Sequence, residues 1–401
     1  MGAAWRGLVA LWPRLAITLI CLAFWRILAA IPLPVAGLVD LRLSSGRLVA
    51  DGGLLVLLLG NPLEQESVVA LGLNSFLDAF IVFWLWAAST GNLEKVHRDQ
   101  RWMWRTLAWL TAGLALARTF GLVLLFVGGR SVTLTSTAGL VSIFGLLLGT
   151  MLLFGLGRVI DRFGEPAGYG VWFLYGVQIL LQGAHHVASW VATDRGDPAL
   201  PTIVAIYVVS STVLLASAVL VFEGVRKVPL RDPGGKTKDV KERVVPLHFL
   251  GGGVIVPIVL ANFAISFIPT LFLEIVLGLS NQQALIYWSA FSPLSLVVIG
   301  YHVMFSIVIV LACLVTTALT VNPGGPTGPY VSRVSKILAA VGGAWMALAV
   351  VWVPLAFQLA LGPSRLRLPV GGGPFVIGAA IFITAIQRVR RQNPGLSVTA
   401  S

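Results

Sequence analysis

The sequence has little charge, almost no cysteine and no motif that would bind a nucleotide or a metal ion. Only 11% of its 401 residues are charged, whereas about a quarter are charged in an average soluble domain. Its two cysteines, Cys21 and Cys313, lie inside apolar runs, which excludes a disulfide framework and favours a packing role. The chain also lacks evident paired aspartates, a zinc motif or a serine–histidine set. We therefore expect no catalytic residues, no metal site and no cofactor.

Long apolar runs are what the sequence does have. Apolar residues make up 57% of the chain, and runs of about 20 residues, long enough to cross a bilayer, recur along its whole length. The pattern predicts an all-α membrane protein. We place ten transmembrane helices near residues 15–35, 68–90, 106–127, 138–157, 169–190, 201–222, 251–273, 296–320, 337–360 and 372–387.

The basic residues are distributed unevenly around these spans. The net charge is +12. With ten spans, the side that holds both termini carries 20 Lys and Arg residues, and the opposite side carries six. Cytoplasmic loops are enriched in Lys and Arg, so we expect a multi-pass membrane protein with both termini in the cytoplasm. The basic residues are scattered over short loops, which disfavours direct nucleic-acid binding.

Three connections between spans have distinctive compositions. Residues 52–63 (GGLLVLLLGNPL) are apolar but too short to span, which fits either a re-entrant segment or an interfacial loop. Residues 224–247 form the largest polar loop, which is either a solvated face or a docking surface for an acidic partner. Residues 322–330 (NPGGPTGPY) are rich in Gly and Pro and are predicted to be non-helical.

Two opposite charges lie inside predicted spans. Asp78 is in the second span and Arg118 is in the third. A charge at mid-membrane costs about 2.5–3.5 kcal/mol on insertion scales, so such residues usually face the protein interior and pair. The two residues are natural partners, although Arg118 could instead extend to an interface.

Several segments resemble the SecY family, the central channel subunit of the bacterial protein translocase, and they occur in the same order. The matching segments are VVALGLNSFLDAFIV (68–82), GTMLLFGLGRVIDRFGEPAGYG (149–170), VFEGVRKVPL (221–230), LGGGVIVPIVLANF (250–263) and GGGPFVIGAAIF (371–382). The resemblance implies two pseudo-symmetric five-helix halves, residues 1–196 and 197–401, that close like a clamshell around a pore. It also implies a short re-entrant plug helix near residues 53–63, including Gly53, Leu58 and Gly60.

The resemblance further implies a ring of aliphatic side chains in the pore. A narrow apolar collar blocks ions by dewetting and makes no specific bonds to the peptide that slides through it. Ordinary helix packing gives the same apolar spacing, so the residues alone leave both interpretations open. The ring would consist of Leu73, Leu77, Ile81, Phe173, Val177, Val259 and Ile377.

The same resemblance implies a lateral gate and a set of partners. The gate would involve Asp78, Arg118 and Asn262, and Arg226 and Lys227 would dock partners. The implied partners are unfolded polypeptides, small single-span subunits similar to SecE and SecG, and a SecA-like motor or a ribosome.

The short eighth-to-ninth connection departs from the family and puts docking of the motor or ribosome in doubt, which suggests a divergent or accessory channel. The expected function is to translocate polypeptides across the membrane or insert them into it. The alternative is a secondary transporter of a small molecule, in which ionisable groups would converge near the bilayer midplane.

Overall fold

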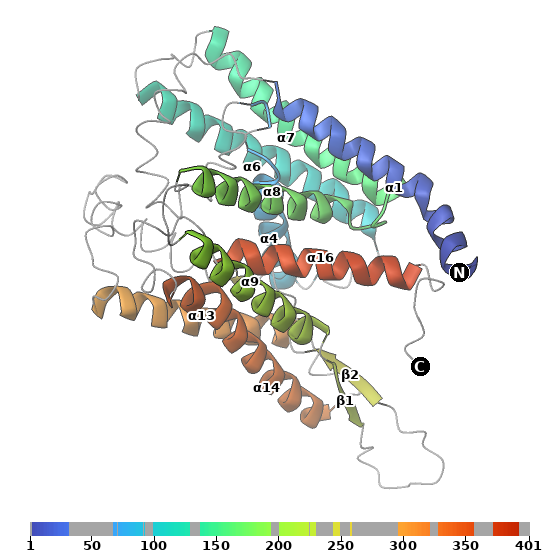
Figure 1. Cartoon of the computed structure of the whole chain (residues 1–401), viewed down its shortest axis with the longest axis vertical. Helices are drawn as coiled ribbons and strands as arrows, with labels where there is room; N and C mark the ends of the chain where they lie inside the picture. The colour runs from blue at the N-terminus through green and yellow to red at the C-terminus, as the bar shows by residue number, and fades with distance from the viewer. Residues whose placement is uncertain are drawn as a thin grey trace. The chain divides into compact units, whose positions relative to one another are not determined.

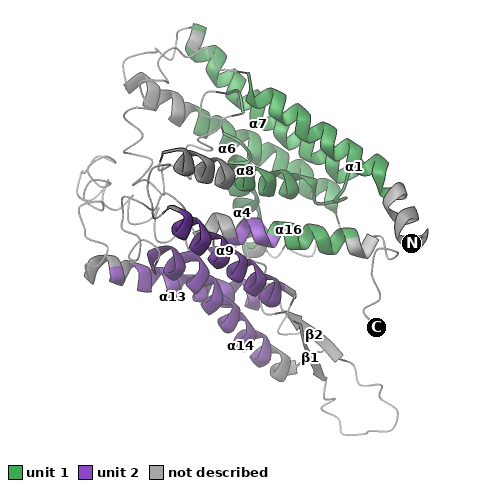
Figure 2. Cartoon of the chain, viewed as in Figure 1, with its two compact units in different colours: residues 1–186, 381–401 green, residues 187–380 purple. Residues whose placement is uncertain are grey.

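The described part of the chain is helical apart from one two-stranded ribbon (Figure 1). A computed structural model describes residues 2–31, 67–69, 71–90, 92, 99–128, 137–193, 200–223, 225–229, 244–248, 257–258, 296–320, 328–356 and 372–392. The chain forms two compact units, one of residues 1–186 and 381–401 and one of residues 187–380 (Figure 2).

Long helices make up the first unit. α1 packs against α7, α7 packs against α6, and α6 packs against α4. Asp99 caps the start of α6, because its carboxylate accepts a hydrogen bond from the backbone N–H of Trp102 at 2.9 Å. The helices are α1 (Gly2–Ala29), α4 (Asn74–Ser89), α6 (Gln100–Gly128), α7 (Thr137–Phe163), α8 (Gly170–Thr193, in this unit to residue 186) and the end of α16 (Gly372–Gln392) from Ile381.

The second unit is built around an antiparallel helix pair. α13 packs against α14, and α14 continues into a short π-helix. Indole N–H groups hold the helices of this unit together: Trp345 donates to Ser217 at 3.1 Å, and Trp352 donates to Ser306 at 2.9 Å. The elements are α9 (Leu200–Glu223), β1 (Val225–Pro229), β2 (Val244–His248), α13 (Leu296–Thr320), α14 (Gly328–Ala347) and the π-helix η3 (Leu348–Trp352).

Helices occupy nine of the ten predicted spans within the described residues. The predicted span 251–273 lies outside them except at residues 257 and 258, so the count of ten stays a prediction. By length and composition, four described helices could cross a membrane, and they lie at Leu11–Ala29, Gly139–Phe163, Pro201–Phe222 and Arg333–Ala356. The compact units differ from the predicted halves because residues 381–401 belong to the first unit. The pseudo-symmetric division at residue 196 stays a prediction.

Large apolar side chains point outward from these helices. Trp109 on α6 is 74% exposed and Leu220 on α9 is 73% exposed. In water such a surface would be costly, whereas lipid tails are as apolar as these side chains. The exposed surface therefore matches a protein embedded in a bilayer.

Two connections differ from the prediction. The connection 224–247 contains an antiparallel ribbon in which Val225 pairs with His248 and Val228 pairs with Val245. Residues 328–330 were predicted to be non-helical, and this is wrong, because α14 begins at Gly328. Pro329 is tolerated there, since the N–H groups of the first helical turn have no partner within the helix.

Candidate functional site

The two charges expected inside the membrane form an ion pair in the first unit. A guanidinium nitrogen of Arg118 on α6 contacts a carboxylate oxygen of Asp78 on α4. The side chains are only 12% and 29% exposed, respectively. Tyr175, a buried residue of α8, interacts electrostatically with both charges. The ion pair therefore joins two packed helices, α4 and α6, within a largely apolar bundle.

A cluster of aromatic rings surrounds the start of α4. Phe76 is fully buried, and its ring centroid lies 5.0 Å from that of Trp172 on α8 and 5.8 Å from that of Phe154 on α7. Its ring also stacks on Trp104 of α6 at 6.3 Å. Sequence analysis did not identify this cluster, because the four residues are far apart in the sequence. The cluster fixes one face of α4 while Asp78 fixes another.

Six of the seven predicted pore residues lie within the described chain. Leu73, Leu77, Ile81 and Ile377 are buried, and Phe173 and Val177 are partly buried. Leu73 lies in the turn before α4 and not in the helix itself. Phe173 contacts Phe382 of α16 edge to face, with ring centroids 6.0 Å apart. These positions suit either a closed collar or helix packing, so the pore ring stays a prediction.

The segment that leads into α4 contacts α7, α8 and the turn that follows α1. The N–H of Val68 donates to the carbonyl of Ile31, two residues after the end of α1, at 3.1 Å. On α7, Gly149 lies against the backbone of Val68, where a Cβ would overlap the carbonyl oxygen. On α8, the buried side-chain oxygen of Gln178 accepts a hydrogen bond from the N–H of Leu73 at 3.0 Å.

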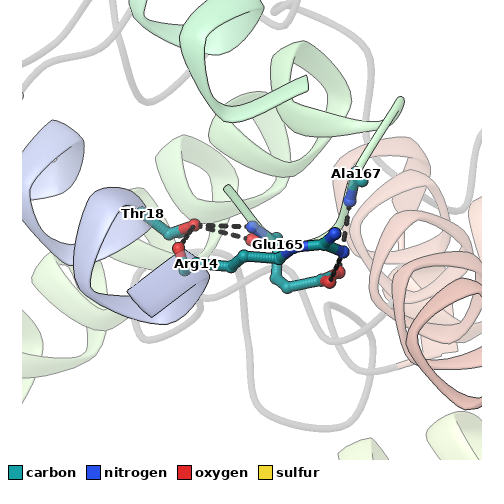
Figure 3. Close-up of polar contacts among 4 residues, drawn as sticks. All are labelled: Arg14, Thr18, Glu165 and Ala167. Atoms are coloured by element: carbon teal, nitrogen blue, oxygen red, sulfur yellow. Dashed lines mark hydrogen bonds and ion pairs between the residues drawn. The ribbon is translucent and has the colours of Figure 1, made fainter. Parts of the chain in front are cut away.

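A second polar centre joins α1 to the turn between α7 and α8 (Figure 3). The Thr18 hydroxyl accepts a hydrogen bond from the N–H of Glu165 at 3.0 Å and lies 2.8 Å from the Glu165 carbonyl, to which it can donate. The Glu165 carboxylate is buried, and it pairs with Arg14 at 3.1 Å and accepts from the N–H of Ala167 at 3.3 Å. These contacts fix the turn on the face of α1.

The same turn is also held by α7 and α16. Asp161 accepts hydrogen bonds from the N–H of Gly170 and, at 2.6 Å, from Arg158. On the other side, Arg388 of α16 donates to the carbonyl of Gly168 at 3.1 Å, and its guanidinium lies 5.0 Å from the ring centroid of Tyr169.

Several predicted site residues lie outside the described residues. These are Val259, Asn262 and the whole plug segment with Gly53, Leu58 and Gly60. Arg226 and Lys227 lie in β1, so the predicted docking residues belong to the ribbon and not to an irregular loop. Within the described ranges, no group of three or more His, Cys, Asp or Glu residues could hold a metal ion.

Comparison with known proteins identifies the family. The family model for SecY matches residues 67–325, which is more than half of the chain. The chain belongs to the SecY family. The match begins at the segment before α4 and includes Asp78, Arg118 and the two predicted docking residues, Arg226 and Lys227.

Curated SecY relatives align over most of the chain. Protein translocase subunit SecY from Rickettsia typhi is 24% identical over 417 aligned residues, covering 94% of this chain and 92% of the relative. The SecY of Streptomyces griseus is 23% identical and covers 94% of each chain. The similarity is therefore spread over the whole protein and is not confined to one motif.

Solved structures of SecY and Sec61 share the fold. A structure described as a protein conducting channel gives a TM-score of 0.59 at 15% identity, covering 98% of this chain and 95% of that chain. Sec61 from the canine ribosome–channel complex gives 0.57 at 15% identity, with the same coverage. At such identities the likeness establishes the fold. It is consistent with the multi-pass membrane architecture that the apolar spans predict.

Proposed function

We propose that this SecY-family protein forms a protein-conducting channel that moves polypeptides across the bacterial cytoplasmic membrane or inserts them into it. The observation that carries the proposal is the family match together with an alignment over 94% of the chain to a protein translocase subunit. The channel itself is passive and catalyses no reaction. Energy comes from a partner or from ongoing translation.

The proposed conduction pathway relies on apolar packing. In the closed channel, the collar of Leu73, Leu77, Ile81, Phe173, Val177, Val259 and Ile377 excludes water and ions, and residues 53–63 form the plug. A polypeptide can slide through such a collar because aliphatic side chains make no specific hydrogen bonds with it. Burial of Leu73, Leu77, Ile81 and Ile377 supports this assignment.

We assign a gating role to the Asp78–Arg118 ion pair. α4 and α6, which carry the two residues, are packed neighbours. They form one side of the proposed gate, and the predicted seventh and eighth spans form the other. In the proposed gate, Asn262 lies across the seam from the pair.

Partners of the proposed channel are small single-span subunits and a cytoplasmic motor or ribosome. Arg226 and Lys227 on the ribbon provide the basic docking surface, while the short connection after α13 weakens docking and makes this a divergent or accessory channel.

We expect the double charge reversal Arg226→Glu with Lys227→Glu to abolish partner binding in membranes, measured by co-sedimentation. Reversal of Arg101 and Arg105, two exposed basic residues of α6, is the matched control. Binding of the ribbon variant at the parent level would place docking elsewhere.

The proposed function is tested by purification in mild detergent followed by reconstitution. Mass spectrometry should detect small single-span subunits bound to the chain. With those subunits and the motor, vesicles should protect a signal-bearing polypeptide from added protease. A tightly bound metabolite and no protected polypeptide would instead favour the secondary transporter.

A further inference from the structure

The segment before α4 is unusually well buried for a connection. Val69 and Leu71 are 0% exposed and Leu73 is 1% exposed. A buried connection needs partners for its backbone polar groups, because no water or lipid can satisfy them. We call residues 67–73, apart from Ala70, the entry segment.

Gln178 provides the hydrogen-bond acceptor for the backbone N–H at the end of the entry segment. It is only 1% exposed, and its Oε1 accepts from the N–H of Leu73 at 3.0 Å. Leu73 immediately precedes α4, where N–H groups have no partner within the helix. An amide on α8 therefore caps the start of α4 from a position 105 residues away in the sequence.

Gly72 makes room for this contact. Its φ is +54°, in the left-handed region that favours glycine. A Cβ at residue 72 would lie 2.7 Å from the amide carbon of Gln178, well inside van der Waals contact. Glycine at residue 72 therefore allows both this backbone conformation and the close approach of the Gln178 amide.

We propose that Gln178 is a positioning residue that keeps the channel closed by fixing the entry segment on α8. Two predicted collar residues are directly attached to this contact: Leu73 donates the hydrogen bond, and Val177 precedes Gln178 in α8. The entry segment also follows the predicted plug, residues 53–63, in the sequence. One hydrogen bond therefore links two of the predicted collar positions, Leu73 and Val177, between the entry segment and α8. This inference rests on the proposed channel function.

The test measures resting ion conductance of the purified channel, with the subunits that remain bound to it, in planar bilayers. Gln178→Met keeps the length of the side chain but removes the acceptor, and we expect resting conductance to rise about fivefold, the factor that corresponds to one neutral hydrogen bond. Gln178→Glu, assayed at pH 5, where a fully buried carboxyl is uncharged, keeps a carbonyl oxygen as acceptor at the same position and should retain most of the parent's closure. Gly72→Ala, which displaces the amide from the other side, should raise conductance like Gln178→Met and should not add to it in the double variant.

Thr150→Val is the matched control. Thr150 is fully buried next to Gly149, but its hydroxyl bonds to the carbonyl of Leu146 in its own helix. The proposal is overturned if Gln178→Met conducts like the parent, if Thr150→Val leaks equally, or if Gln178→Glu leaks as much as Gln178→Met. If Gln178→Met does not fold, the comparison of Gly72→Ala with Thr150→Val decides.

The experiment distinguishes failure of the Gln178 positioning role from failure of the proposed channel function. A parent that opens with a signal-bearing polypeptide, while the Gln178 and Gly72 variants leave its resting conductance unchanged, refutes only the positioning role. A parent that neither conducts nor translocates with its subunits and motor refutes the channel.

Discussion

At the scale of single residues, the bundle is organised by a few polar contacts in an apolar setting. The Asp78–Arg118 pair joins α4 to α6, and Thr18 joins α1 to the turn after α7. Low dielectric surroundings strengthen such contacts, and they also raise the cost of leaving one partner alone. Removing one partner of the ion pair should therefore destabilise the fold more per substitution than removing both partners together.

We expect Asp78→Asn and Arg118→Gln each to lower the free energy of unfolding by about 2–3 kcal/mol, below the range for a fully buried pair because Asp78 is 29% exposed. The double variant should cost less than the sum, since no orphan charge is left. Thermal unfolding in detergent measures all three. Strictly additive effects would contradict an energetic coupling between the two charges.

Thr18→Val tests the second polar centre. The substitution keeps the shape of the side chain but leaves the buried N–H and carbonyl of Glu165 without this partner, and we expect a loss of about 1–3 kcal/mol. Thr119→Val is the control, since the Thr119 hydroxyl is also buried but donates to the carbonyl of Ala115 in its own helix. Equal losses of thermal stability in the two variants would show that Thr18 does not tie α1 to the turn.

Sequence could predict the charged pair but not the other polar contacts. Asp78 and Arg118 stand out because charges are rare in apolar spans and adjacent spans usually pack together. Gln178 and Glu165 carry no such signal, because their partners are backbone groups that only the folded chain brings close. A side chain that bonds to a distant backbone leaves no spacing pattern in the sequence.

At the scale of elements, helices were more predictable than connections. The eighth predicted span, 296–320, coincides with α13, since a run of apolar residues needs only local information to be recognised. The β1–β2 ribbon was missed because pairing of Val228 with Val245 depends on a register between segments that are separated by a polar loop. The start of α14 was missed because proline was treated as a breaker in a position where helices accept it.

Deletion of residues 53–63 tests the proposed plug. The segment is apolar and too short to span, as expected of a plug, and its removal should unblock the pore and raise ion leak through reconstituted channels. Replacing the same residues by a Gly/Ser linker of equal length controls for the shortened connection and should leak as well. Parent-level conductance in both variants would show that this segment does not seal the pore.

At the scale of the whole molecule, the sequence was enough to predict the family and the helical fold. The order of weak matches along the chain indicated the SecY family, which the family model over residues 67–325 confirms. Charge distribution gives the orientation by a separate argument, since 20 basic residues lie on one predicted side and six on the other. Orientation is therefore a prediction that can fail even though the family is correct.

Labelling of single cysteines in intact cells tests the orientation. Cys21 and Cys313 are buried, and replacing both by alanine provides a background without thiols. In that background, a membrane-impermeant maleimide should label Ser131→Cys, in a predicted external connection, and should leave Ser401→Cys, at the predicted cytoplasmic C-terminus, unlabelled. Permeabilised cells should label both, which controls for thiol reactivity. Labelling of Ser401→Cys alone in intact cells would mean that the positive-inside bias fails for this chain, and the basic ribbon at Arg226 and Lys227 would then face away from any cytoplasmic partner.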